Sequence, residues 1–418
     1  MTALLSPSAA SEPSTSAVRP LYAQAAGSPI RATLALASLP DMVSLAGGHP
    51  DPALLPLAWV RDGLRAVLAN ASEAALQYGP TEGLPVLREA SAALLRSRGL
   101  RAEAGNVLIT TGSQQGIDLL ARVLVEPGDA IAVARFNYPA AVQSLRFAGA
   151  RFVPMDSDAQ GMCTGNLEQK LQASNARVLY LVPNFGNPGG ALMSLERRMQ
   201  LLEIAGRMGV TVIEDDPYGE LWFDAPPPAT LAALNQQTGS KAHVVYLTSF
   251  SKTIAPALRL GLVYAPAVIA RAVVIAKQAA DVHSGALEQS LLAAMLAEGR
   301  LDQHLATLRG AYAAKRDALV AALGRHCAST LTFDKPGGGM FVWARLRPDI
   351  PLLGDDAWIE FGKRHRVLVV PGSAFNADAT PQPWLRLSFA NPSASALAVG
   401  AERLGAGLDA LVPPQCPR

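Results

Sequence analysis

The sequence VVYLTSFSKT at residues 244–253 runs from an apolar burst into a loop of small hydroxyl residues that carries a lysine. Similar bursts rich in Val and Ile recur along the chain, and longer Ala- and Leu-rich segments of helical period separate them. This alternation predicts an α/β fold in which helices sandwich a mostly parallel central sheet. The predicted strands are 106–110, 130–134, 178–182, 210–214, 244–248 and 260–264. The predicted helices are 115–125, 195–207 and a long one over 285–323.

The pattern changes near Arg300. From there the sequence predicts a helix, an antiparallel set of strands and a closing helix. The strands are 331–333, 340–346, 367–370 and 384–389, and the closing helix is 393–411. We expect a smaller α+β domain at 301–418, joined by residues 21–45, beside a large domain at 46–300. Residues 1–20 are rich in Ser, Pro and Ala, which is typical of a flexible tail.

The composition is that of a globular protein large enough for two domains. The chain has 418 residues, of which 50% are hydrophobic and 17% charged, and its mean hydropathy is +0.20. Its 36 basic and 34 acidic residues give a net charge of +2, and no run of Lys and Arg stands out. We therefore expect neither a nucleic acid nor a membrane surface as a partner.

Cysteine use and the N-terminal sequence bear on the cellular compartment. Cys163, Cys327 and Cys416 include no C-x-x-C pair and are odd in number, which argues against a disulfide framework and a cysteine zinc site. The first twenty residues lack the basic start and long apolar run of a secretion signal. No uncharged apolar stretch of about 18 residues, the length of a membrane span, is present. We expect a cytoplasmic protein with no metal site.

The loop after the strand at 244–248 carries the first candidate for chemistry. Lys252 lies between Ser249 and Arg259, so an amine that can form an imine is joined to several anion donors. The alternative is an ordinary surface lysine beside hydroxyl groups that cap the turn.

A second candidate is ITTGSQQG at 109–116, where a predicted strand passes through a glycine turn into a helix. Gly112, Ser113 and Gln114 would place free N–H groups and a hydroxyl at the helix N-terminus, which suits a phosphate. The alternative is a helix capped by Ser113. The segment is neither a nucleotide P-loop nor a dinucleotide fingerprint.

Two further loops follow predicted strands. VIEDDPY at 212–218 ends a buried strand in acidic residues, at the position where open α/β sheets bind ligands. Metal binding competes with this interpretation, but no histidine is near in sequence. VPNFGNPGG at 182–190 offers Asn184 and Asn187 as amide donors, although either could simply form a turn.

In this order, the motifs resemble the fold-type I pyridoxal phosphate (PLP) enzymes, specifically the class I/II aminotransferases of the aminoadipate and kynurenine aminotransferase group. The resemblance extends from about Ile30 to Leu411. Its further motifs are SLAGGHPDP at 44–52, QYGPTEG at 77–83, GGGMFVW at 337–343, and PGSAF and LRLSF within 371–389. The resemblance implies a homodimeric aminotransferase that moves an amino group between an L-α-amino acid and a 2-oxo acid through an internal aldimine, a quinonoid and pyridoxamine phosphate.

The resemblance also implies a role for each matching residue around the cofactor ring. Lys252 would hold PLP as the internal aldimine and later move the proton. Asp215, selected by the family's Asp-x-x-Tyr spacing, would pair with the pyridinium nitrogen. Tyr218 and Asn187 would hydrogen-bond to the phenolate oxygen, and Tyr138 would stack on the ring.

The remaining implied contacts concern the phosphate and the substrate. The phosphate would be held by Gly112, Ser113, Gln114, Ser249 and Arg259, with Tyr78 from the neighbouring subunit. Arg386 would clamp the substrate α-carboxylate, and Gly48 and Asn187 would lie beside the substrate. Arg31 would either answer a distal carboxylate or aromatic ring of the substrate, or cap a helix at the domain edge.

Two alternatives to transamination stay open. The same site could serve another PLP reaction, such as that of a β-lyase, decarboxylase, cyclase or amino acid oxidase. The chain could also be a PLP-binding regulatory domain, but about thirty residues before Ile30 are too few for the DNA-binding segment that such regulators carry. The amino donor and the 2-oxo acceptor are left undetermined.

Overall fold

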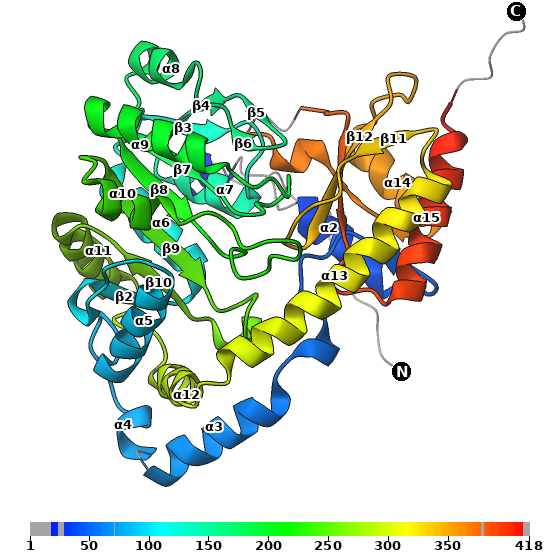
Figure 1. Cartoon of the computed structure of the whole chain (residues 1–418). Helices are drawn as coiled ribbons and strands as arrows, with labels where there is room; N and C mark the ends of the chain where they lie inside the picture. The colour runs from blue at the N-terminus through cyan, green and yellow to red at the C-terminus, as the bar shows by residue number, and fades with distance from the viewer. Residues whose placement is uncertain (1–17, 24–28, 71, 378–379, 413–418) are drawn as a thin grey trace, which may run out of the picture.

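The computed structural model describes residues 18–23, 29–70, 72–377 and 380–412, so the predicted tail lies outside the described residues except for 18–20. The strands of the largest sheet are β2 (Val107–Thr110), β3 (Ala130–Ala134), β4 (Arg151–Met155), β7 (Val178–Leu181), β8 (Thr211–Asp215), β9 (His243–Ser249) and β10 (Gly261–Tyr264). They form one seven-stranded sheet in the order β2-β10-β9-β8-β7-β3-β4 (Figure 1). Only β10 is antiparallel to its neighbours within this sheet. The predicted mostly parallel sheet is confirmed.

Helices cover both faces of this sheet, because alternate strand residues point to opposite sides and are apolar on both. On one face, residues such as Ile131 and Val245 pack with α6, α7 and α11. On the other face, residues such as Ile109 and Leu179 pack with α5, α8, α9, α10 and α12. These helices are α5 (Pro85–Ser97), α6 (Gly112–Leu124), α7 (Pro139–Phe147), α8 (Leu167–Ser174), α9 (Leu195–Met208), α10 (Leu231–Thr238), α11 (Ala267–Ala280) and α12 (Ala286–Ala297).

A long helix, α13 (Leu301–His326), leads to a second, smaller sheet (Figure 1). Its strands are β11 (Leu331–Phe333), β12 (Phe341–Leu346), β14 (Val370–Pro371) and β15 (Trp384–Ser388). They pair antiparallel in the order β11-β12-β15-β14. Two helices accompany this sheet, α14 (Asp355–His365) and α15 (Ala394–Asp409), and α15 packs along α13.

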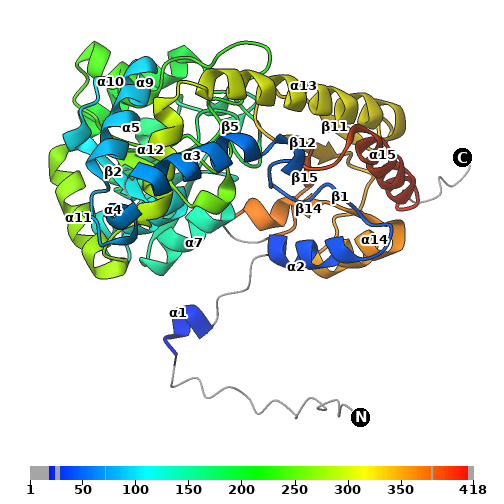
Figure 2. The ribbon, with the colours of Figure 1, turned by 90° about the horizontal axis from the view of Figure 1, so that it is seen from below.

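The beginning of the chain lies beside the smaller sheet, where it contributes to a separate two-stranded sheet. β1 (Val43–Ser44) pairs in parallel with β13 (Val367–Leu368), and α2 (Pro29–Ala35) packs near β14 (Figure 2). In contrast, α3 (Leu57–Asn70) and α4 (Ser72–Leu76) pack against α12. The remaining elements are α1 (Pro20–Ala23), the hairpin of β5 (Ser157–Asp158) and β6 (Gly161–Met162), and short 3-10 turns.

Two predicted elements are wrong in detail. The long helix over 285–323 is two helices, α12 and α13, because Gly299 between them has φ +69°, a conformation that glycine adopts without strain. The predicted strand at 367–370 is two strands, since β13 pairs with β1 and β14 pairs with β15.

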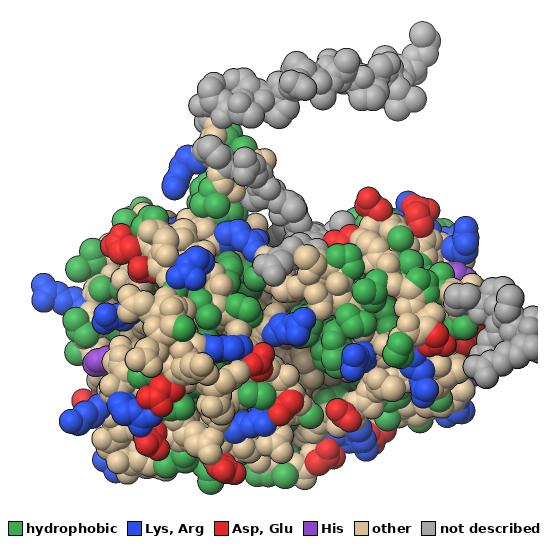
Figure 3. Space-filling model, turned by 90° about the horizontal axis from the view of Figure 1, so that it is seen from above, with side chains coloured by type: hydrophobic (Ala, Val, Ile, Leu, Met, Phe, Trp, Pro, Cys, Tyr) green, Lys and Arg blue, Asp and Glu red, His purple; other side chains and the backbone are tan. Residues whose placement is uncertain are grey.

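Within the described part of the chain, no helix is both long and apolar enough to cross a membrane. The face in Figure 3 carries acidic and basic side chains interspersed with one another.

Candidate active site

Six strands of the large sheet, all except β10, run in the same direction, so their carboxyl ends meet at one edge. The predicted site residues end these strands or lie in the loops that follow them: Gly112, Tyr138, Asn187, Asp215 and Lys252. Open α/β sheets bind ligands at this edge.

Asp215 is a buried carboxylate with one unsatisfied oxygen. It is 2% exposed, and its Oδ2 accepts a hydrogen bond from Tyr180 Oη at 2.7 Å. Its Oδ1 is buried and has no hydrogen-bond partner. Burial raises the pKa of Asp215 to about 7; the Tyr180 hydrogen bond opposes this shift and the neighbouring Asp216 charge adds to it. A buried carboxylate oxygen without a hydrogen bond destabilises the folded protein, so Asp215 Oδ1 is suited to accept from a cationic donor on a ligand.

Asp216, by contrast, is saturated by the protein itself. Its Oδ1 accepts hydrogen bonds from Asn184 Nδ2 and from the N–H of Gly219, both at 2.9 Å. Its Oδ2 accepts from Tyr246 Oη at 3.1 Å. Of the two adjacent acids, Asp215 is therefore the one with an oxygen to offer.

Lys252 lies partly buried in the turn after β9, where its Nζ donates to the Gly48 carbonyl at 3.0 Å. Burial, together with the nearby charges of Arg386 and Arg259, lowers the pKa of Lys252 to about 8. The lowered pKa leaves part of the amine neutral near neutral pH, which suits both imine formation and general base catalysis.

Arg386 brings a cation from the smaller sheet to the same place. It is 2% exposed on β15, and its Nη1 donates to Asn187 Oδ1 at 2.9 Å. Its Nη2 donates to the Ala46 carbonyl, whereas its Nε is buried without a partner. The rings of Phe341 and Phe375 lie 4.3 and 4.9 Å from its guanidinium carbon. Burial lowers the pKa of Arg386 to about 10.

The N-terminus of α6 forms a candidate anion site with Arg259. Thr111, at the N-cap, makes no side-chain cap, so the first N–H groups of the helix stay available to an anion. Gly112 has φ +75°, and a Cβ there would lie 2.6 Å from Arg259 Nη2. Only glycine therefore lets this guanidinium approach the turn. Arg259 also donates to Ser251 Oγ at 3.4 Å.

Three further residues predicted at the phosphate lie at or near this turn. Ser113 is in the first turn of α6. The Gln114 side chain donates to Ala140 O at 3.1 Å and to Ser144 Oγ at 2.9 Å, both in α7, so its backbone N–H is the group left for an anion. Ser249 is buried and its hydroxyl donates to the nearby Ser251 at 2.9 Å.

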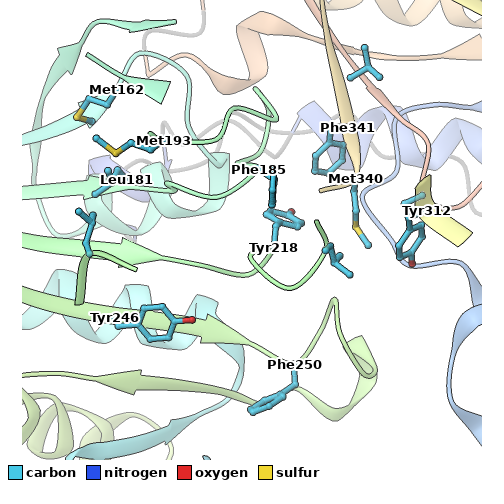
Figure 4. Packing of buried hydrophobic residues seen from close by; sticks show 14 of the residues in the cluster. Met162, Leu181, Phe185, Met193, Tyr218, Tyr246, Phe250, Tyr312, Met340 and Phe341 are labelled. Carbon is cyan, nitrogen blue, oxygen red and sulfur yellow. The ribbon is translucent and has the colours of Figure 1, made fainter. Parts of the chain in front are cut away.

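Two tyrosines complete this edge of the sheet. Tyr138 precedes α7, and Tyr218 is 5% exposed with its ring edge-on to Phe341 at 6.1 Å (Figure 4). Burial raises the pKa of both tyrosines, and both respond to the charge of Asp215.

The structure does not bring every predicted residue into the cluster. Tyr78 is 81% exposed, and its ring contacts His283 at 5.7 Å. Arg31 is on α2, but its side chain lies outside the described part of the structure.

Sequence reasoning missed several residues of the site. Tyr180 has the pattern of a core aromatic, and only the parallel pairing of β7 with β8 places it beside Asp215. Phe341 lies within the GGGMFVW motif, although that motif alone assigns it no contact. Ser251 is one of four hydroxyl residues within 248–253, and the sequence does not single it out as the partner of Arg259.

Among the residues that the structure describes, no group of three or more His, Cys, Asp or Glu side chains is placed to hold a metal ion. The donor set is instead complementary to PLP. Asp215 Oδ1 suits the protonated ring nitrogen, Lys252 suits the aldehyde, and the start of α6 with Arg259 suits the phosphate.

Comparison with known proteins agrees with this assignment. Residues 40–404 match the family described as aminotransferase class I and II. The chain is 36% identical over 385 residues to the 2-aminoadipate transaminase of Thermus thermophilus, covering 92% of this chain and 94% of that protein.

Two solved structures share the fold. The α-aminoadipate aminotransferase of Thermus thermophilus, complexed with N-(5′-phosphopyridoxyl)-L-leucine, has a TM-score of 0.87 at 33% identity, covering 95% of this chain and 98% of that one. The kynurenine aminotransferase of Pyrococcus horikoshii has a TM-score of 0.88 at 33% identity, covering 94% and 97%. The chain therefore belongs to the class I and II aminotransferases, PLP-dependent enzymes of fold type I, within the group of the aminoadipate and kynurenine aminotransferases.

Proposed function

We propose a role for three residues in the transfer of the amino group from an amino acid to a 2-oxo acid. Lys252 transfers the proton, Asp215 pairs with the cofactor ring nitrogen, and Arg386 binds the substrate α-carboxylate. The observation that carries the proposal is a convergence at one sheet edge. A lysine with a lowered pKa and a buried carboxylate with an unpaired oxygen lie at this edge, and a buried guanidinium from the smaller sheet bonds Asn187 of the same edge.

PLP, when bound, supplies the electron sink that makes the α-proton of an amino acid acidic. The carboxylate of Asp215 keeps the ring nitrogen protonated, since an opposite charge nearby favours the charged form. Lys252 Nζ, neutral in part near neutral pH, takes the proton from the substrate α-carbon as a general base and returns a proton as a general acid.

Arg386 orients the substrate for this proton transfer. Its planar fork can bind a carboxylate with two charge-assisted hydrogen bonds, and these fix the direction of the Cα–H bond. Phe341 and Phe375 hold the guanidinium by cation–π contacts, so little side-chain freedom is lost when the substrate binds.

We also infer a homodimer with shared active sites, in which Tyr78 of each subunit reaches the cofactor phosphate of the other. Large apolar side chains on α3, α4 and α5 are exposed, which suits an interface: Leu57, Leu68, Leu76 and Val86. A reducing, cytoplasmic compartment fits the free thiols of Cys163 and Cys327.

A panel of amino donors would determine which substrate side chain the enzyme prefers. By their names, the relatives described above act on aminoadipate, which is acidic, and on kynurenine, which is aromatic. Acidic, aromatic and branched donors should therefore be assayed against 2-oxoglutarate and pyruvate, with product mass as the readout.

Borohydride reduction tests the role of Lys252 directly. The reduced and digested protein should yield one phosphopyridoxyl peptide, and that peptide should contain Lys252. The exposed Lys241→Ala variant is the control and should give the same peptide. A Lys252→Ala protein that still forms a borohydride-stable adduct would overturn the assignment.

A further inference from the structure

Behind the N-terminus of α6, a buried lysine belongs to a hydrogen-bond network that the proposed reaction does not use. Lys277 of α11 is fully buried. Its Nζ donates to the two carboxylate oxygens of Asp281, at 2.7 and 2.9 Å. It also donates to Gln115 Oε1 at 2.9 Å and to Ser284 Oγ at 3.2 Å. A buried ammonium is costly unless it is paired in this way, so these acceptors are needed for the fold to hold the lysine here.

The network reaches the turn in front of α6 through Thr111. The Thr111 hydroxyl donates to Asp281 Oδ2 at 3.1 Å and lies 2.9 Å from Ser284 Oγ. The Thr111 N–H donates at 2.8 Å to Gln115 Oε1, the oxygen that the buried lysine also holds. Because Thr111 makes no side-chain cap on α6, its hydroxyl serves the network and not the helix.

The loop that carries Asp281 and Ser284 is itself strained. Val282 has φ +65°, a left-handed conformation that a β-branched residue rarely adopts. Gln289 holds this loop by donating to Ser284 O at 2.7 Å while its Oε1 accepts from the Leu84 N–H at 2.7 Å. Backbone strain of this kind persists only where the surroundings over-determine the conformation, and it is concentrated at functional sites.

We propose that Lys277, Asp281 and Thr111 are positioning residues for the cofactor phosphate. The network fixes the turn at 111–113, so that the first N–H groups of α6 and the Arg259 guanidinium converge on one anion. None of the three residues needs to touch that anion, because each acts through the backbone of the turn. A turn that is already ordered binds the phosphate without an ordering cost. This inference rests on the proposed phosphate site.

The test compares two ligands on the cofactor-free, full-length protein. Pyridoxamine 5′-phosphate and pyridoxamine have no aldehyde to react with a lysine, so calorimetry gives their dissociation constants, and the ratio isolates the phosphate contribution. Asp281→Asn removes the charge pair. Thr111→Val removes the hydroxyl contacts with Asp281 and Ser284, which are the side-chain link to the turn, and leaves the charge pair and the Thr111 N–H bond to Gln115 in place. Each substitution should raise the dissociation constant of pyridoxamine 5′-phosphate by about tenfold or more and leave that of pyridoxamine unchanged.

Two controls separate the possible failures. Arg316→Met removes another buried cation, on α13, which pairs with the exposed Asp224 at 2.8 Å, and should lower Tm without changing the ratio. Arg259→Met tests the phosphate site itself, and an unchanged ratio there would refute that site. If Arg259→Met lowers the phosphate contribution while Asp281→Asn and Thr111→Val do not, the positioning role alone is overturned. If Thr111→Val weakens the binding of both ligands equally, the positioning role is overturned as well.

Discussion

Asp215 and Asp216 are adjacent in sequence but have opposite surroundings. Three donors saturate the carboxylate of Asp216, whereas Asp215 receives one hydrogen bond, from Tyr180. An unsatisfied buried acceptor lowers the stability of the cofactor-free protein, and the same oxygen becomes favourable once a protonated ring nitrogen faces it. Function and stability therefore oppose each other at this residue.

We predict that Asp215→Asn stabilises the cofactor-free protein above neutral pH. In the unmodified protein the pKa of Asp215 is raised from 3.8 to about 7. The stability that the protonated carboxyl contributes is therefore present at low pH and lost as pH rises through about 7. At pH 8 the variant should be more stable to unfolding by on the order of 2–4 kcal/mol, and the gain should shrink at pH 5. Chemical denaturation at both pH values measures this.

Asp216→Asn is the matched control for that measurement. It disturbs an acid that is already saturated, so it should destabilise the protein at both pH values. A gain for Asp215→Asn that is the same at pH 5 and pH 8 would contradict the raised pKa. If Asp216→Asn abolishes transamination and Asp215→Asn does not, the assignment of the ring-nitrogen partner is wrong by one residue.

Arg386 should act on every amino donor, whatever its side chain, because it is expected to bind the part that all donors share. Arg386→Gln should keep the cofactor but lose about ten- to 150-fold in kcat/KM, the range for losing hydrogen bonds to a charged group. Arg345→Gln, an exposed arginine of the adjacent strand β12, is the control and should behave as wild type. An unchanged kcat/KM in folded, cofactor-loaded Arg386→Gln would place the carboxylate elsewhere.

At the scale of the element, α6 depends on a glycine at its first residue. Gly112→Ala should release the cofactor on dialysis, because the added Cβ would lie 2.6 Å from Arg259 Nη2. Gly128→Ala is a close control, since Gly128 also has a positive φ, +96°, but nothing lies within 4 Å of a Cβ there. Both variants should lose about 1–3 kcal/mol of stability from backbone strain. Only Gly112→Ala should lose the cofactor, and equal retention in both would contradict the anion site.

Across the whole molecule, one predicted cofactor contact is left outside the cluster. Tyr78 is 81% exposed, as expected for a residue that serves a neighbouring subunit. Mixing Tyr78→Phe with Lys252→Ala protein should restore activity, because the heterodimer has both lesions in one site and leaves the other site native. Each variant alone is the control. If subunit exchange is demonstrated by mass and no activity returns, Tyr78 does not act in trans.

Much of this architecture is encoded in contiguous residues. The Val- and Ile-rich bursts and the helical periods between them were enough to predict a mostly parallel sheet and a smaller antiparallel one, because periodicity reports which faces are buried. The motifs around Gly112, Asp215 and Lys252 each left an ordinary structural interpretation open, and they indicated PLP only through the resemblance of all the motifs, in order, to the fold-type I enzymes. A break such as Gly299 was missed, because glycine within a helical pattern has no single structural meaning.

The finer design of the site depends on residues far apart in the chain. Tyr180 meets Asp215 through the pairing of two strands, Arg386 meets Asn187 across 199 positions, and Lys277 meets Gln115 across 162. Such contacts follow from strand register and from how the two sheets pack, and neither is written in local propensity or spacing. Short sequence motifs therefore indicate the cofactor. The unpaired oxygen of Asp215 and the lowered pKa of Lys252, in contrast, arise only when the folded protein excludes water around these two residues.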